Sequence, residues 1–364
     1  MATVAVSQIK PGDKIAQDVL TPLGSVLFHK GKIVTARELE ILQAFLVPSV
    51  VINSTDDKNT DEDSSADKTS DSNKQSVKAA SPLMEQYDLT VALLKRVFAQ
   101  VNSGVNIPIL DIRNQLEALL QHIGDYKILN FSPPSVNNND YLFHKSVMSA
   151  MSCYMLAQWN SFPRNEWMQA ALAGLLHDIG NAKVDSAILN KPSNLTTEEV
   201  EEMKRHTVNG YQLLKNVTAL TEGAKLAALQ HHERVDGSGY PLGLEAQKIH
   251  PFAKLVAISD IFNAMTMKRA YRKATSPYVV LEQIQKDSFG KLEPVYVQTF
   301  IDKVTQFHNG TLVRLSDNRI GEIVFSDRNA PTRPWVSVNG TIINLTVERQ
   351  LFIEEIIPKT DSSK

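Results

Sequence analysis

The sequence has a single cysteine, no apolar run long enough to cross a membrane and no excess of basic residues. The lone thiol, Cys153, excludes an internal disulfide framework and favours a reducing compartment. No stretch of about 18 apolar residues occurs, and the N-terminus lacks the basic region and apolar core of a signal peptide. The net charge of −2 argues against binding of nucleic-acid polymers. We therefore expect a cytoplasmic globular protein without a membrane span.

Composition changes along the chain divide it into several parts. Residues 1–52 combine short apolar runs with one helical pattern and predict a small α/β module. Residues 53–82 are mostly Ser, Thr, Asp, Asn and Lys, and predict a disordered polar linker. Residues 83–308 have helical periodicity, residues 309–357 have short apolar runs separated by glycines, and residues 358–364 form a polar tail. The expected fold class is mainly α, a helical bundle with a small α/β module before it and a small β module after it.

Histidines recur through the helical region at spacings of about one helix-turn-helix unit. They are His144, His177, His206, His231 and His232. Taken alone, His177 can interact with the dipole of a helix that Gly180 closes as C-cap, and His206 can be a satisfied core residue. The adjacent His231 and His232 are harder to explain, because neighbouring side chains on a helix point about 100° apart and rarely share one packed interior.

Two aspartates occur in comparable settings. Asp178 follows His177 directly, and Asp260 lies in the apolar pattern "FAKLVAISDIFNAM", where an unpaired buried carboxylate would be costly. Nitrogen and oxygen ligands without cysteine suit Mn, Fe, Co, Ni or Zn, and the set exceeds what one tetrahedral ion needs. A carboxylate such as Asp178 can bridge two ions, and paired ions suit phosphoester hydrolysis. His231 and His232 would then each supply one imidazole to neighbouring ions.

These stretches resemble the HD-GYP phosphodiesterases of the HD superfamily. The similarity covers residues 140–275 and runs, in the order of that family, through "HKSVMSAM", "LLHDIGNAKVDSAILNKPSNLTTEEVEEMKRHTVNGYQLL", "LQHHERVDGSGYPLGLEAQKI" and "KLVAISDIFNAMTMKRAYR". The segment around "HHERVDGSGYPLGL" is highly specific. The resemblance implies an all-α phosphodiesterase that opens cyclic di-GMP, a bacterial second messenger, with two or three divalent metal ions, most often iron or manganese.

The resemblance also assigns roles to residues by position. The positions of metal ligands are held by His144, His177, Asp178, His206, His231, His232 and Asp260. Asp140, four residues before His144, stands where some members carry a glutamate that binds a third metal. Tyr240 lies in the loop that shapes the dinucleotide pocket, and Arg269 and Arg272 match basic positions that contact substrate phosphates.

Several supporting positions depart from the family pattern. Asn181 stands where the family has a lysine beside the metals, and Lys183 is the nearest alternative cation. Loss of a fixed charge near a developing oxyanion slows catalysis, so we expect slow hydrolysis and predict that Asn181→Lys raises kcat more than it changes KM. Asn263 replaces an aspartate, and Ala270 replaces a proline.

These departures leave three readings of the function open. The first is hydrolysis of cyclic di-GMP to pGpG or GMP. The second is hydrolysis of another cyclic dinucleotide such as cyclic GMP-AMP, and the third is a weak or inactive receptor or scaffold. Metal content measured together with turnover separates an enzyme from a receptor. The expected partner is the cyclic dinucleotide, and the flanking modules offer surfaces for partner proteins or for a homodimer.

Overall fold

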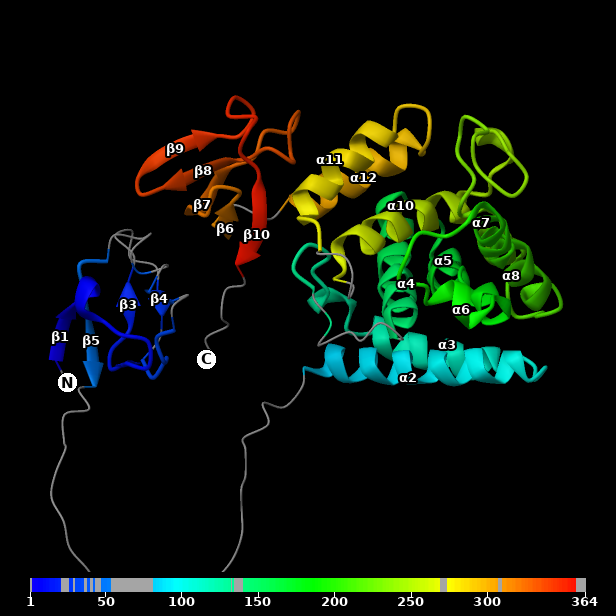
Figure 1. Cartoon of the computed structure of the whole chain (residues 1–364), viewed down its shortest axis with the longest axis horizontal. Coiled ribbons are helices and arrows are strands. Elements are labelled where there is room, and N and C mark those ends of the chain that lie inside the picture. The colour runs from blue at the N-terminus through cyan, green and yellow to red at the C-terminus, as the bar shows by residue number, and fades with distance from the viewer. Residues whose placement is uncertain are drawn as a thin grey trace, which may run out of the picture. The chain divides into compact units, whose positions relative to one another are not determined.

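The computed structural model describes residues 2–20, 26–28, 30–35, 38–39, 42, 47–53, 81–131, 133, 140–268, 274–306 and 310–357. The predicted linker, apart from its ends, and the predicted tail lie outside these residues. The chain divides into two compact units. The first comprises Met1–Ala79, His308–Phe325 and Arg333–Lys364, and the second comprises Ala80–Phe307 and Ser326–Thr332. Figure 1 shows the elements of both units.

The described part of the first unit forms three antiparallel sheets. One has the strand order β1-β5-β2, with β1 (Ala2–Ala5), β5 (Ser49–Asn53) and β2 (Lys14–Ile15), and η1 (Val6–Gln8) follows β1. A second pairs β3 (Val19–Leu20) with β4 (Val26–Phe28). The third has the order β10-β6-β7-β8-β9, with β6 (Leu312–Leu315), β7 (Ile320–Phe325), β8 (Trp335–Val338), β9 (Thr341–Asn344) and β10 (Ile353–Ile357).

Residues from both ends of the chain contribute to one hydrophobic core in this unit. Val6, Ile15 and Ile52 from the N-terminal strands and the turn after β1 belong to the same buried cluster as Ile320 and Ile357 from the C-terminal sheet. Burial of apolar area is the main favourable term in folding, so the two terminal segments stabilise each other.

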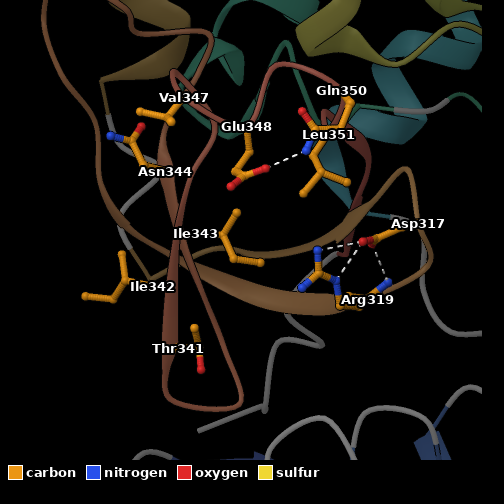
Figure 2. Close-up of a pocket in the computed structure, with 10 residues that line it drawn as sticks. All are labelled: Asp317, Arg319, Thr341, Ile342, Ile343, Asn344, Val347, Glu348, Gln350 and Leu351. Atoms are coloured by element: carbon orange, nitrogen blue, oxygen red, sulfur yellow. Dashed lines mark hydrogen bonds and ion pairs between the residues drawn. The ribbon is translucent and has the colours of Figure 1, made fainter.

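The C-terminal sheet carries an open hollow (Figure 2). The residues that line it are Asp317, Arg319, Thr341, Ile342, Ile343, Asn344, Val347, Glu348, Gln350 and Leu351. Its charged groups are paired locally, because Arg319 Nε donates to Asp317 Oδ2 at 2.6 Å and Gln350 donates to Glu348. None of the predicted site residues that the structure describes lines this hollow.

The second unit is helical, which confirms the expected fold class. Its helices are α2 (Pro82–Asn102), α3 (Ile109–Leu120), α4 (Tyr141–Trp159), α5 (Arg164–Leu176), α6 (Ser186–Leu189), α7 (Thr197–Lys204), α8 (His206–Leu214), α9 (Glu222–Gln230), α10 (Pro251–Thr266), α11 (Pro277–Asp287) and α12 (Pro294–Thr305). Short 3₁₀ helices are η2 (Ile123–Asp125), η4 (Ile179–Lys183) and η5 (Ala246–Lys248). Among the described residues, no helix combines the length and apolar character needed to cross a bilayer.

Helices α4, α5 and α10 lie at the centre of this unit (Figure 1). Consecutive residues are buried along each of them, so they have no polar face to present to water. A Cβ on Gly174 of α5 would lie only 2.6 Å from the carbonyl oxygen of Ser149 on α4, so the glycine lets the two backbones approach closely. This packing places the end of α5 beside α4 and α10.

Local sequence signals fix the start of α7 as predicted. Thr196 accepts a hydrogen bond from the backbone N–H of Glu199, and the Glu199 carboxylate accepts one from the backbone N–H of Thr196, which completes a capping box. The cap sets where α7 begins and therefore where His206, two residues after its end, enters α8.

Gly180 has a different role from the C-cap that the sequence suggests. Helix α5 already ends at Leu176, and Gly180 lies inside η4 without a positive φ. A Cβ at this position would collide with the carbonyl oxygen of His206 and lie 2.5 Å from the backbone nitrogen of Gly210. Gly180 therefore lets η4 pack directly on α8, which brings His206 next to the end of α5.

Candidate metal centre

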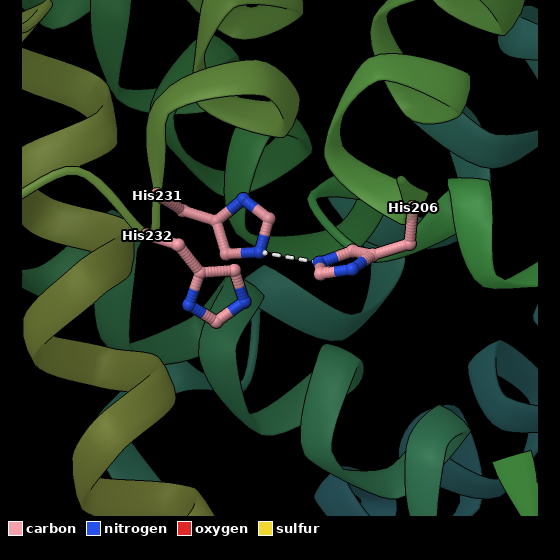
Figure 3. A group of neighbouring side chains, drawn as sticks. All are labelled: His206, His231 and His232. Carbon is pink, nitrogen blue, oxygen red and sulfur yellow. Dashed lines mark hydrogen bonds between the residues drawn. The ribbon is translucent and has the colours of Figure 1, made fainter. Parts of the chain in front are cut away.

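Three histidines gather at the ends of two helices (Figure 3). His206 is the first residue of α8, and His231 and His232 directly follow α9. The Nδ1 atom of His206 lies 2.6 Å from the carbonyl oxygen of Met203, and that of His231 lies 3.1 Å from the carbonyl oxygen of Ala227. Because a carbonyl oxygen only accepts, both Nδ1 atoms donate, and a neutral ring then presents its Nε2 as a lone pair.

The Nε2 atoms of His206 and His231 face each other at 3.2 Å (Figure 3). Burial lowers the pKa of His206, and it lowers the pKa of His231 to about 4, so both rings are neutral at pH 7. Neither ring then has a proton to share, and the contact joins two lone pairs. Burial also holds the pKa of His232 well below its usual value. Three neutral imidazoles therefore lie close together, as the ligands of one divalent ion would.

Asp178 connects this histidine group to a second cluster. Its Oδ1 lies 3.5 Å from His206 Nε2 and 3.7 Å from His231 Nε2. Its Oδ2 lies 3.3 Å from His177 Nε2 and 2.6 Å from the Nζ of Lys145. Although burial opposes ionisation, Lys145 and His177 hold the pKa of Asp178 well below its usual value. The two oxygens of one carboxylate thus face two neighbouring positions, as a bridging ligand would.

Lys145 is a buried cation of this cluster that the sequence motifs do not indicate. Its Nζ lies 2.6 Å from Asp178 Oδ2 and 2.5 Å from Asp260 Oδ1, and its side chain is only 11% exposed. Burial would lower the pKa of Lys145, but the two carboxylates more than offset that effect and raise it. Its signal in the sequence is a charged residue in the mostly uncharged pattern "FHKSVMSAM", directly after His144.

His177 and Asp260 complete the second cluster. His177 Nδ1 donates to the carbonyl oxygen of Gly174 at 2.8 Å, and its Nε2 lies 3.3 Å from Asp260 Oδ1. Burial alone would lower the pKa of His177, but Asp178 and Asp260 raise it to about 9. The buried carboxylate of Asp260 on α10 is therefore paired with two cations, Lys145 and His177, which offset the cost of its burial.

The structure does not bring His144 and Asp140 into this cluster. His144 Nδ1 lies 2.9 Å from the hydroxyl of Tyr87, and the two rings stack with centroids 5.6 Å apart. Asp140 pairs with Lys95 at 2.6 Å. The adjacent Lys145 points into the cluster because neighbouring side chains on α4 diverge by about 100°.

Asn181 and Lys183, the predicted catalytic positions after Asp178, have different surroundings. Asn181 is buried, and its backbone N–H donates to the carbonyl oxygen of Asp178 at 3.0 Å. Lys183 donates from Nζ to the carbonyl oxygen of Val101 on α2 at 3.2 Å, so that ammonium is engaged away from the cluster. Asn263 donates to Ser149 Oγ at 3.1 Å. Arg269, Arg272 and the neighbouring Ala270 lie outside the described residues.

Tyr240 forms one wall beside the histidine group. Its ring stacks on His232 with centroids 4.7 Å apart and an interplanar angle of 19°, and Lys204 Nζ lies 5.5 Å from the ring centre. The Glu233 carboxylate holds the following loop by accepting backbone N–H bonds from Leu242 and Leu244 at 2.7 and 2.9 Å. An aromatic face and an ammonium group thus border the centre.

Among the residues that the structure describes, two groups of side chains have ligand atoms close enough to hold an ion. One consists of His206, His231 and His232, and the other of His177, Asp178 and His231. Two nitrogens bound about 2.1 Å from one ion are separated by roughly 3.0 to 3.4 Å, which matches the observed 3.2 Å between Nε2 atoms. The donor set therefore fits a divalent metal at the three histidines. In the second group, the Lys145 ammonium already pairs with the Asp178 carboxylate.

Comparison with known proteins agrees with these motifs. Residues 125–292 match a family model described as an HD domain. Cyclic di-GMP phosphodiesterase PA4108 of Pseudomonas aeruginosa is 32% identical over 201 residues, which cover 55% of this chain and 48% of that protein. The 3'3'-cGAMP-specific phosphodiesterase 2 of Vibrio cholerae is 30% identical over 159 residues, which cover 43% of this chain and 30% of that protein. The chain thus spans about half the length of the Pseudomonas aeruginosa relative and a smaller share of the Vibrio cholerae one.

A solved structure has a similar fold. Bd1817, a HDG"Y"P protein from Bdellovibrio bacteriovorus, superposes with a TM-score of 0.50 at 15% identity, and the match covers 83% of this chain and 99% of that one. At this identity the likeness concerns the fold alone. The HD-domain match and the relatives show that residues 125–292 of this chain are similar to HD domains, and the ordered His and Asp motifs lie within that stretch.

Proposed function

We propose that the helical unit is a metal-dependent phosphodiesterase that hydrolyses cyclic di-GMP to pGpG or GMP. The observation that carries the proposal is the histidine group, in which His206 and His231 turn two Nε2 lone pairs toward each other at 3.2 Å beside Asp178. This arrangement suits a divalent ion of the kind that hydrolytic phosphodiesterases use. The name of the Pseudomonas aeruginosa relative supports cyclic di-GMP as substrate.

The side chains around the centre suit a cyclic dinucleotide. A bound divalent ion supplies a Lewis acid for a phosphate oxygen and lowers the pKa of the attacking water. Tyr240 offers a ring face for a purine base, and Lys204, whose Nζ pairs with the exposed Glu201 at 2.6 Å, brings a cation beside that face. Arg269 and Arg272 are proposed to hold the second phosphate by paired N–H donors. Hydrolysis adds one water across one phosphodiester bond and yields the linear dinucleotide.

The proposal extends to metal identity and cellular setting. A donor set of imidazole and carboxylate accepts Mn, Fe, Co, Ni or Zn. The resemblance to the HD-GYP phosphodiesterases favours iron or manganese among them. A cytoplasmic location is proposed from the single buried thiol and from the substrate, and protein partners or a second copy of the chain are proposed to bind the first unit.

Incubation of the full chain with cyclic di-GMP tests this function. After anaerobic loading with Mn²⁺ or Fe²⁺, chromatography should show pGpG or GMP, and the His206→Ala and Asp178→Ala variants should show neither. Lys183→Met is the matched control, because its ammonium is bonded to Val101 on α2, and it should keep activity within about threefold. Intact cyclic di-GMP after loading with either metal would contradict the proposal.

A second substrate deserves the same assay because relatives from Vibrio cholerae are named 3'3'-cGAMP-specific phosphodiesterases. Parallel reactions with the two nucleotides give the ratio of kcat/KM. The departure at Asn181 favours slow turnover, and calorimetric binding of nucleotide without product would identify a receptor instead of an enzyme.

A further inference from the structure

We infer that Lys145 takes the place of a second metal ion, so that the centre holds one divalent ion and one fixed ammonium group. The ion belongs among His206, His231 and His232, and the ammonium belongs between Asp178 and Asp260. This inference rests on the proposed metal centre, but it does not depend on which nucleotide is the substrate.

The first argument is position. Lys145 Nζ lies 2.6 Å from Asp178 Oδ2 and 2.5 Å from Asp260 Oδ1, and His177 Nε2 lies 3.3 Å from each of these oxygens. An ion on these atoms would need metal–oxygen distances of about 2.0 to 2.2 Å. It would therefore fall on the spot that the ammonium group occupies, and the two cations compete for the same oxygens.

The second argument is burial. The side chains of Lys145, Asp178 and Asp260 are 11%, 4% and 10% exposed, so none of the three charges can be transferred to water without a large movement. Lys145 sits on α4, where the residues that flank it are buried as well. An ammonium that left the two carboxylates would have to be solvated or paired elsewhere, which a packed helix does not offer.

The third argument is charge. Lys145 already places one fixed positive charge between Asp178 and Asp260, beside the imidazole of His177. A second divalent ion would add two more positive charges to a site that water hardly reaches. The histidine group has no such conflict, because the neutral lone pairs of His206 and His231 face each other without a proton between them.

Metal stoichiometry tests the inference without any nucleotide. The full chain is stripped with EDTA, loaded anaerobically with Mn²⁺ and desalted, and manganese per chain is measured by elemental mass spectrometry. We expect one ion in the native protein, with the paramagnetic resonance spectrum of an isolated Mn²⁺. Lys145→His removes the ammonium and adds a ligand nitrogen beside Asp178 and Asp260, so we expect two ions and the spectrum of a spin-coupled pair.

Matched variants make the result specific. Lys183→His makes the same exchange at a lysine whose ammonium is bonded to Val101, and it should keep one ion. His231→Ala should abolish binding. If Lys145→His fails to fold by circular dichroism, Lys145→Met also frees both carboxylates and should bind a second, weaker ion.

The remaining outcomes count against the inference in distinguishable ways. Two ions in the native protein would overturn it and leave the proposed metal centre standing. One ion in a folded Lys145→His variant, or no second ion in Lys145→Met, would also overturn it. No ion in the folded native protein at saturating Mn²⁺ would overturn both the inference and the proposed function.

Discussion

At the scale of single residues, the sequence identified six of the groups that meet at the centre. His177, Asp178, His206, His231, His232 and Asp260 all contribute to the two clusters. The motifs could not show whether His144 or Lys145 faces the same place. Rotation of a helix about its axis is usually read from its apolar stripe, and α4 is buried on nearly all sides. Only packing against α5 and α10 sets that rotation, and packing is not visible in a sequence.

A prediction at this scale concerns the stability that Lys145 provides in the absence of metal. Lys145→Met leaves Asp178 and Asp260 with His177 as their remaining close cation. Breaking a buried ion pair by removing one partner costs about 3 to 5 kcal/mol, so the free energy of unfolding in urea with EDTA at pH 7 should fall by that amount.

The control for that measurement is Lys183→Met. This lysine is exposed and donates one hydrogen bond to the Val101 carbonyl, so its loss should cost only about 1 kcal/mol. Equal losses in the two variants would mean that the Lys145 pairing does not stabilise the folded chain.

The structure also changes what is expected of Asn181. From the sequence, Asn181 leaves the site without the lysine of the family, and Lys183 is the nearest cation that could replace it. Lys183 is instead bonded to α2, and Lys145 already brings an ammonium to the Asp178 carboxylate. The gain in kcat predicted for Asn181→Lys should therefore be smaller in the native chain than the sequence alone suggests, because two ammonium groups would share one buried site.

At the scale of elements, close backbone packing positions the ligands. Local signals such as the Thr196–Glu199 capping box were readable in the sequence because both partners are three residues apart. The role of Gly180 was not readable, because it depends on α8, which follows some 25 residues later in the chain and packs on η4.

This packing gives a second prediction. Gly180→Ala places a methyl group against the His206 carbonyl and the Gly210 nitrogen, both of which are backbone atoms that cannot rotate away. Overpacking of this kind costs about 1 to 3 kcal/mol, and the displacement of His206 should also weaken Mn²⁺ binding at least tenfold. Gly124→Ala is the control, since a Cβ there meets nothing within 4 Å and no positive φ is involved. Unchanged metal affinity in Gly180→Ala would show that the contact with α8 does not position His206.

At the scale of the whole molecule, the two compact units differ in how far the sequence described them. The helical unit could be outlined from periodicity, because its helices are long and its motifs are ordered along the chain. The joint core of the N-terminal strands and the C-terminal sheet could not, because Ile15 and Ile357 lie at opposite ends of the sequence. Pattern reasoning works within a window of residues and has no measure of contacts between distant segments.

The single cysteine offers a way to follow the stability of the helical unit in the complete chain. Cys153 lies on α4 with no exposed surface, and burial raises the pKa of its thiol to about 12. Only the thiolate reacts with iodoacetamide, and an exposed cysteine with a pKa of about 8.5 is substantially ionised at pH 8. Labelling of the native protein at pH 8 should therefore proceed only through opening of the unit and be orders of magnitude slower than in urea.

Metal should slow that labelling further. An ion that binds only the folded state lowers the open population by a factor of about one hundred when its free concentration is a hundred times Kd, which equals about 2.7 kcal/mol. Intact-mass spectrometry over time, with EDTA and with Mn²⁺, gives the two rates from one thiol. The same comparison on His231→Ala should show no effect of Mn²⁺, because the ion loses an imidazole. Equal rates with and without Mn²⁺ in the native protein would mean that metal binding is not coupled to the fold around α4, and rapid labelling in both conditions would mean that Cys153 is not buried in solution.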